Sequence, residues 1–156
     1  MQRSNSPLGE GTRHVHEPVD IVLIEDDPRD VELTLHVFRQ YRLTNSIHVL
    51  RDGAEALEYF FGDAEEADKL SVRCILLDLK LPRVHGLEVL ERLKSDPRTK
   101  EFPVVVLTAS RETPDLQRAY ELGANSYLCK PIEFQAFVET VRQVGYYWLV
   151  HNQAPD

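Results

Sequence analysis

The stretch from Arg73 to Pro82 constrains the fold of this chain more than any other. The apolar run Cys74 to Leu77 ends in a single carboxylate, Asp78, and Pro82 follows four residues later. A short apolar run of this kind predicts a strand buried on both faces. Asp78 then lies at the carboxyl end of that strand, at the edge where open α/β sheets bind ligands. An aspartate that caps a turn would fit the same position, so this stretch alone leaves both interpretations open.

Length and charge narrow the class of protein. The chain has 156 residues, typical of one domain, and a net charge of −8. The negative charge argues against nonspecific binding to nucleic acid, which needs clustered lysine and arginine. No apolar run approaches the roughly 20 residues of a membrane span, and the N-terminus lacks an apolar signal core. We therefore expect a cytoplasmic protein that binds neither nucleic acid nor membrane.

Two cysteines are too few for a disulfide framework. We expect Cys74 and Cys129 to be buried thiols on strands separated by a third strand, about 9–10 Å apart and beyond disulfide reach. Residues 1–18 show no periodicity and predict a disordered tail. We place one folded domain at residues 19–150 and a short tail at 151–156.

Strand and helix patterns alternate five times along the chain. The predicted strands span 19–24, 46–50, 73–78, 104–107 and 126–129, and the predicted helices span 28–41, 52–61, 87–95, 114–122 and 132 onward. This alternation predicts a parallel sheet with helices on both faces. The predicted fold is therefore α/β, a flavodoxin-like doubly wound (βα)5 with strand order 2-1-3-4-5, which places the first and third strands side by side.

Three acids, Glu25, Asp26 and Asp27, directly follow the first predicted strand. Two such charges 4 Å apart repel each other by about 4 kcal/mol at an effective dielectric near 20. Acids at a helix N-terminus, with Pro28 in the first turn, explain one or two of them. A divalent cation bound by hard oxygen ligands explains a group of acids better. We favour the cation site and expect Asp27 to be the capping residue.

Other polar side chains follow the fourth and fifth strands. Thr108 and Lys130 stand at strand ends equivalent to that of Asp78. Alone, each could be a turn residue or a solvated lysine. Together with the acids they predict a phosphoryl-transfer site, because a nucleophilic Asp78 needs positive charge and hydrogen-bond donors beside an incoming phosphoryl group.

The predicted roles follow from the charges. Asp26 and Asp78 would bind magnesium directly, Glu25 would bind it through water, and the backbone carbonyl of Lys80 would complete the ligand set. Lys130 would supply a point charge to the phosphoryl oxygens, and Thr108 would supply a hydroxyl donor.

At these residues the chain resembles the response-regulator receiver domain of two-component signalling. The matching motifs are Glu25-Asp26, Asp78-Leu-Lys-Leu-Pro82 with Gly86, Thr108-Ala109, and Tyr127-Leu-Cys-Lys130-Pro131, over about residues 20–145. The resemblance implies that Asp78 accepts a phosphoryl group from a histidine kinase, with Mg²⁺ or Mn²⁺ as cofactor. It also implies that Thr108 and Tyr127 form a switch and that the Lys130–Pro131 bond is cis. Such a protein is a signalling phosphoacceptor rather than an enzyme, limited to self-phosphorylation from small donors and slow autodephosphorylation.

Two features narrow the resemblance. The acidic loop 62–71 and the aromatic end with Tyr146, Tyr147 and Trp148 resemble features of the stand-alone receivers that partner phytochrome kinases. These aromatic residues either pack on their own core or form a homodimer contact, and we favour the homodimer. We also expect Lys80 and Ser110 to tune dephosphorylation by controlling the access of water.

Two other functions are alternatives to a signalling phosphoacceptor. A magnesium-dependent phosphatase with an aspartyl nucleophile would need a second acid two residues after Asp78, where this chain has Lys80. A receiver used as a constitutive protein-binding module is a further alternative. A nucleotide enzyme is disfavoured, because neither a Walker nor a Rossmann glycine pattern is present.

Overall fold

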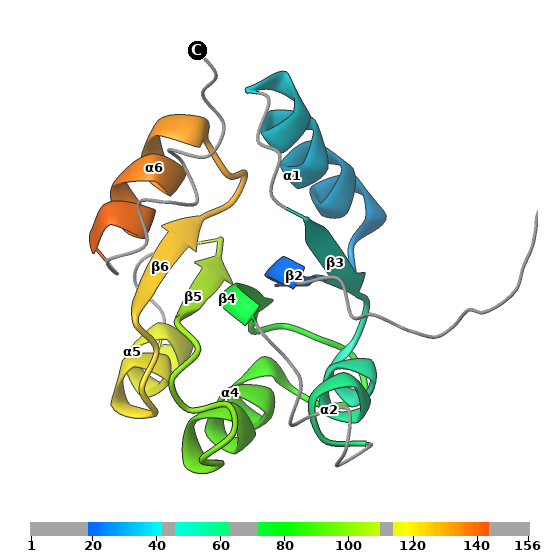
Figure 1. Cartoon of the computed structure of the whole chain (residues 1–156), viewed down its shortest axis with the longest axis vertical. Coiled ribbons are helices and arrows are strands. Elements are labelled where there is room, and N and C mark those ends of the chain that lie inside the picture. Colours follow the sequence, from blue (N-terminus) through cyan, green and yellow to red (C-terminus); the bar gives the residue numbers. More distant parts are fainter. Residues whose placement is uncertain (1–18, 42–45, 63–71, 110–113, 144–156) are drawn as a thin grey trace, which may run out of the picture.

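In the computed structural model of this chain, residues 19–41, 46–62, 72–109 and 114–143 are described. Strands and helices alternate along them (Figure 1). The strands are β2 (Val19–Ile24), β3 (Ile47–Leu50), β4 (Val72–Asp78), β5 (Val104–Thr108) and β6 (Ser126–Cys129). The helices are α1 (Pro28–Gln40), α2 (Gly53–Phe61), α4 (Gly86–Ser95), α5 (Pro114–Glu121) and α6 (Phe134–Gln143).

The strands form one parallel sheet in the order β3-β2-β4-β5-β6. This is the order 2-1-3-4-5 predicted for five strands counted along the chain, so the fold prediction is confirmed. In the sheet, Ile24 lies opposite Leu77, and Asp78 lies opposite Leu107. The polar residues that end β2, β4 and β5 therefore meet at one edge of the sheet.

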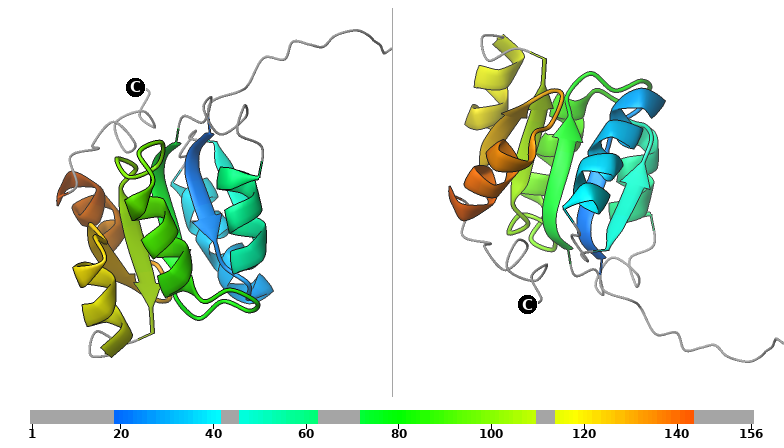
Figure 2. Two further views of the ribbon diagram at one scale, coloured as in Figure 1. Left: turned by 90° about the horizontal axis from the view of Figure 1, so that it is seen from below. Right: turned by 90° about the horizontal axis from the view of Figure 1, so that it is seen from above.

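Helices cover both faces of the sheet, as Figures 1 and 2 show, with α1 and α6 on one face and α2, α4 and α5 on the other. The central strand β4 contributes to both apolar layers. Cys74 and Leu76 pack with the α1 and α6 side, while Ile75 and Leu77 pack with the other side. Because both faces of β4 are covered, its sequence is continuously apolar rather than alternating.

The helix starts follow local capping chemistry. Asp27 caps α1, its carboxylate accepting a hydrogen bond from the Arg29 amide at 2.8 Å, as expected. Asp52 caps α2 by accepting from the Glu55 amide at 2.7 Å. α4 begins one residue earlier than predicted, because His85 caps it with Nδ1, which accepts from the Leu87 amide at 3.1 Å.

Some details of the predicted core are wrong. Cys129 was expected to be buried but is half-buried, because β6 is the outermost strand of the sheet. The two thiols are free and lie on strands separated by β5, as predicted. Strand β3 begins at Ile47 rather than Ser46. Leu35 on α1 and Leu87 on α4 are also half-buried and pack against the edges of the core.

Several predicted features lie outside the described residues. They are the tail 1–18, most of the acidic loop 62–71, Ser110, and the aromatic end with Tyr146, Tyr147 and Trp148. Over the part of the chain that is described, no helix has the length and apolar character that crossing a membrane requires.

Lys94 closes the edge of the sheet opposite the predicted site. Its half-buried ammonium group donates to the carbonyl oxygens of Lys100 and Phe102, at 3.2 and 2.8 Å, and to the Asn125 side-chain oxygen at 3.1 Å. That Asn125 oxygen also accepts from the Val104 amide at 2.8 Å. Burial lowers the pKa of Lys94. The lysine therefore joins the end of α4 to the starts of β5 and β6.

Replacing Lys94 by methionine should destabilise the fold, since three acceptors lose their hydrogen bond from the ammonium group while the apolar stem is kept. We expect the free energy of unfolding in urea to fall by about 1–3 kcal/mol. The matched substitution Lys100→Met, at an exposed lysine of the same segment, should change it by less than about 0.5 kcal/mol. Equal effects of the two substitutions would contradict this role for Lys94.

Candidate functional site

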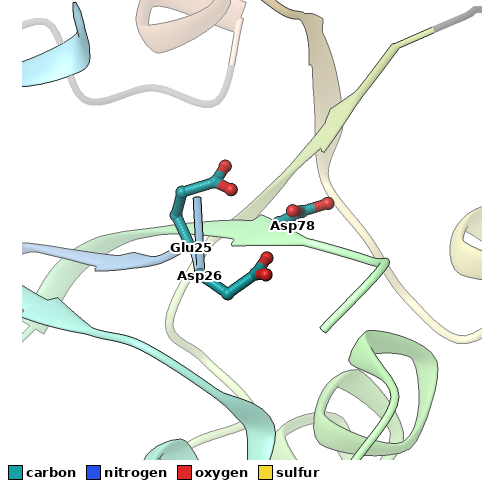
Figure 3. A group of neighbouring side chains, drawn as sticks. All are labelled: Glu25, Asp26 and Asp78. Carbon is teal, nitrogen blue, oxygen red and sulfur yellow. The ribbon is translucent and has the colours of Figure 1, made fainter. Parts of the chain in front are cut away.

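Three carboxylates meet where β2 and β4 end. Glu25 and Asp26 follow β2, and Asp78 ends β4. One oxygen from each lies within 4.8 Å of the others, and Figure 3 shows the three groups gathered at the strand ends. Adjacent parallel strands in register place these residues side by side. Carboxylate oxygens are the ligands that Mg²⁺ and similar hard cations prefer, so this donor set fits such an ion.

Glu25 is the most deeply buried member of this group. Its two oxygens accept from the Asp27 amide at 3.2 Å and from the Lys130 ammonium at 3.1 Å. Burial, reinforced by the negative charge of Asp78, raises the pKa of Glu25 to about 7, while both donors oppose that rise. Additional positive charge beside Glu25 would favour its ionised form.

Asp78 is buried at the end of β4, and each of its oxygens has a partner. Oδ1 accepts from the Lys80 amide at 3.1 Å, and Oδ2 accepts from the Lys130 ammonium at 3.3 Å. The chain then folds back tightly, with the Gly86 amide donating to the Leu79 carbonyl at 2.8 Å. A Cβ atom at Gly86 would lie 2.5 Å from the Asp78 carbonyl oxygen, so only glycine fits there.

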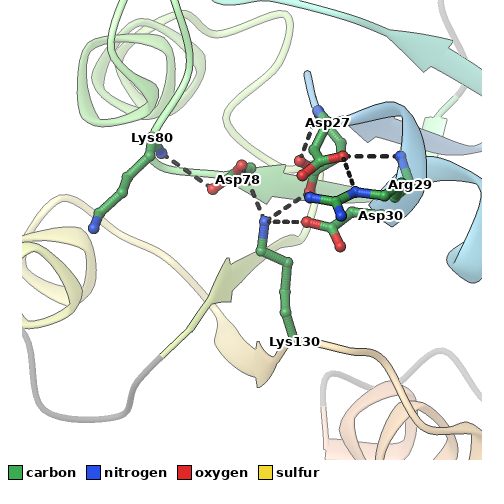
Figure 4. A network of polar contacts seen from close by, with 7 residues as sticks. Asp27, Arg29, Asp30, Asp78, Lys80 and Lys130 are labelled. Carbon is green, nitrogen blue, oxygen red and sulfur yellow. Dashed lines mark hydrogen bonds and ion pairs between the residues drawn. The ribbon is translucent and has the colours of Figure 1, made fainter.

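Lys130 follows β6, and its side chain crosses toward β2 and β4 (Figure 4). Its ammonium contacts Asp30 at 3.0 Å in addition to Glu25 and Asp78. Burial alone would lower the pKa of Lys130, but the hydrogen bond to Asp30 and the charges of Asp78 and Glu25 outweigh burial and raise it. The Lys130–Pro131 bond is cis, as the resemblance implied.

Asp30 was not predicted to take part in the site. It lies in the first turn of α1, four residues after Asp26, and its Oδ2 lies 3.0 Å from the Lys130 ammonium at the same rim. That spacing was a signal in the sequence, but an acid in the first turn of a helix is usually interpreted as favourable to the helix dipole.

Thr108 and Tyr127 occupy different places relative to Asp78. Thr108 is buried at the end of β5, and its carbonyl accepts from the Lys130 amide at 2.9 Å. Tyr127 is half-buried on β6 and meets Tyr120 edge to face, with ring centroids 6.4 Å apart. Thr108 therefore belongs to the rim of the site, whereas Tyr127 lies behind it on the side of α5.

A cavity of about 380 Å³ opens beside Asp78. Thr108, Lys80 and Lys130 line it, together with Asp115 from the start of α5. The side chain of Lys80 is exposed and points away from Asp78 (Figure 4). Asp115, which was not predicted, lies 3.7 Å from His85 and so connects α5 to the loop after β4. The cavity therefore gives a small anionic group access to Asp78 between Lys130 and Thr108.

Comparisons with known proteins agree with this geometry. FilR2, a probable methanogenesis regulatory protein of Methanothrix harundinacea, is 41% identical over 139 residues, 89% of each chain. The structure of the bacteriophytochrome response regulator AtBRR is 44% identical, with a TM-score of 0.75 over 85% of this chain and 96% of that chain. The Mn²⁺-bound form of the response regulator Rcp1 is 34% identical, with a TM-score of 0.67 over 89% of this chain and 100% of that chain.

The match to a protein family covers the same part of the chain as the fold. Residues 21–142, from β2 to α6, match the response regulator receiver domain. Both the acids after β2 and the lysine after β6 fall within this range. The chain therefore belongs to the family of response regulator receiver domains.

Proposed function

We propose that this chain is a cytoplasmic signalling relay in which Asp78 accepts a phosphoryl group from a sensor histidine kinase. The observation that carries the proposal is the convergence of Lys130 and two further carboxylates on Asp78 at one rim of the sheet. A buried carboxylate with a neighbouring ammonium and a cation-binding donor set is suited to attack an anionic phosphorus centre.

The transfer step follows from these groups. An Asp78 oxygen attacks the phosphorus of a phosphohistidine, an O–P bond forms, and the N–P bond breaks. An imidazole protonated on its other nitrogen leaves as neutral imidazole, so the step needs no further proton. Lys130 would then balance charge on the phosphoryl oxygens, and Thr108 would donate its hydroxyl to one of them.

Glu25, Asp26 and Asp78 would hold a Mg²⁺ or Mn²⁺ ion, with the Lys80 backbone carbonyl as a further ligand. When bound, the cation offsets negative charge on the phosphoryl group. Both oxygens of Glu25 already accept hydrogen bonds from other partners, which supports a contact to the ion through water rather than a direct one.

The phosphoryl group would operate a switch through Thr108 and Tyr127. It adds roughly −1.5 to −2 charges at the rim. A charge-assisted hydrogen bond contributes about 1.5–3 kcal/mol, whereas moving a population from 1:99 to 99:1 needs about 5.5 kcal/mol. Thr108 alone is therefore insufficient, so Lys130 must contribute or the resting chain must already sample the active form. Tyr127 would turn away from Tyr120 as the surface of α5, β6 and α6 changes.

The partner kinase that we propose is of the phytochrome type. AtBRR is a bacteriophytochrome response regulator, and it aligns with most of this chain at 44% identity. A homodimer through the aromatic end remains our proposal for the assembly.

Replacing Asp78 by asparagine should abolish phosphoryl uptake from acetyl phosphate with Mg²⁺ and from a phytochrome-type histidine kinase, because an amide cannot act as the nucleophile. Mass spectrometry of the intact chain measures the uptake. Glu91→Gln, a matched loss of one charge on the exposed side of α4, should leave it unchanged. Full incorporation in the Asp78→Asn chain would rule out Asp78 as the acceptor.

Removing the metal should stop the transfer while the fold persists. Excess EDTA is expected to abolish uptake from acetyl phosphate, and added Mg²⁺ should restore it. Asp26→Asn should weaken Mg²⁺ binding by about tenfold or more, measured by isothermal titration calorimetry. Unchanged Mg²⁺ affinity in this variant would exclude Asp26 as a ligand.

Lys80 lines the cavity beside Asp78, so shortening it should admit water more freely to the aspartyl phosphate. We expect Lys80→Ala to shorten the half-life of phosphorylated Asp78 after the donor is removed. Lys100→Ala, at an exposed lysine remote from the cavity, provides the control. A half-life equal to that of the wild-type chain would reject a tuning role for Lys80.

A further inference from the structure

In the unphosphorylated chain, the ammonium group of Lys130 already contacts as many acceptors as it has N–H donors. It has three N–H donors. Three carboxylates surround it, with Asp30 at 3.0 Å, Glu25 at 3.1 Å and Asp78 at 3.3 Å. Figure 4 shows the contacts to Asp30 and Asp78. The contact to the proposed acceptor, Asp78, is thus the longest of the three. Any new anion at the rim must take Lys130 from a partner that it already has.

Asp30 differs from the other two carboxylates in what else it can bind. Among the described residues, the group placed to hold a metal ion consists of Glu25, Asp26 and Asp78, and Asp30 is not part of it. A cation at that group would draw Glu25 and Asp78 toward itself. Asp30 is then the carboxylate left to hold Lys130.

The backbone holds Asp30 in position. It lies in the first turn of α1, whose start is set by the Asp27 cap and by Pro28. Its side chain is 27% exposed and that of Lys130 is 20% exposed, so water screens the pair only partly. The positive end of the helix dipole also attracts negative charge at this place.

We propose that Asp30 is a positioning residue that restrains Lys130 in the unphosphorylated chain and competes with the incoming phosphoryl group for its ammonium. The proposal rests on the proposed function of Asp78. It makes Asp30 a brake on phosphoryl uptake that acts through Lys130, without contact to the metal ion or to the reacting phosphorus.

The central test is the rate of phosphoryl uptake from acetyl phosphate at saturating Mg²⁺. Asp30→Asn keeps the size of the side chain but removes its charge, and should raise the rate by roughly twofold to fivefold, as expected for a partly exposed ion pair. Glu32→Gln is the matched control, because Glu32 is an exposed acid on the same helix that pairs with Arg39. It should leave the rate unchanged.

A double-mutant cycle separates this role from a general effect of charge. If Asp30 acts through Lys130, then Asp30→Asn should have no effect on the rate in a Lys130→Gln background. A gain that persists without the lysine would overturn the proposal, because simple repulsion between Asp30 and the phosphoryl donor would then explain it.

A spectroscopic measurement on the metal-free, unphosphorylated chain tests the restraint on Lys130 without phosphoryl transfer. The ¹⁵Nζ–¹H signal of the Lys130 ammonium should be protected from exchange with water in the wild-type and Glu32→Gln chains. It should exchange faster in Asp30→Asn, where one of the three partners has lost its charge. Equal exchange in all three chains would show that Asp30 does not restrain the lysine.

The outcomes distinguish the two proposals. If the wild-type chain takes up no phosphate, both the relay function and the brake are refuted. If the wild-type chain is phosphorylated but Asp30→Asn is no faster, or is slower, the brake alone is refuted.

Discussion

The ion pairs of Lys130 are the interaction on which the rest of the site depends. They connect residues 52, 100 and 105 positions apart in the chain, from β2, α1, β4 and the end of β6. Parallel strands make this possible, since their carboxyl ends all face one edge. The apolar strands and their covering helices bring the acids within reach of the Lys130 ammonium group. Its positive charge offsets part of the repulsion between the grouped carboxylates.

Much of this arrangement could be predicted from the sequence, because it depends on periodicity and on strand ends. Alternating apolar runs and helix patterns indicated the doubly wound sheet and its order. Once the order was known, Glu25 and Asp26 had to lie beside Asp78. The role of Asp27 as a cap could also be predicted, since it precedes a proline in the first turn of a helix.

The features that were missed depend on the direction of a side chain rather than on the position of a residue along an element. Asp30 lies in the first turn of the helix that follows the predicted acids, but only the path of the Lys130 side chain makes it part of the site. Nothing in the sequence around Lys94 sets it apart from the other four lysines, and its three acceptors come together only after α4, β5 and β6 have packed. The exposure of Cys129 similarly reflects the outer position of β6, which apolar pattern alone does not convey.

The two edges of the sheet are built from different kinds of interaction. At the edge of Lys94, an ammonium is bound by neutral carbonyl and amide oxygens, which carry the same charge in every state of the protein. At the edge of Lys130, the partners are carboxylates, whose contacts with the ammonium would change if an ion or the proposed phosphoryl group bound there. If Asp78 accepts a phosphoryl group as proposed, the charges at the edge of Lys130 would rearrange, while the neutral contacts of Lys94 at the opposite edge would stay the same.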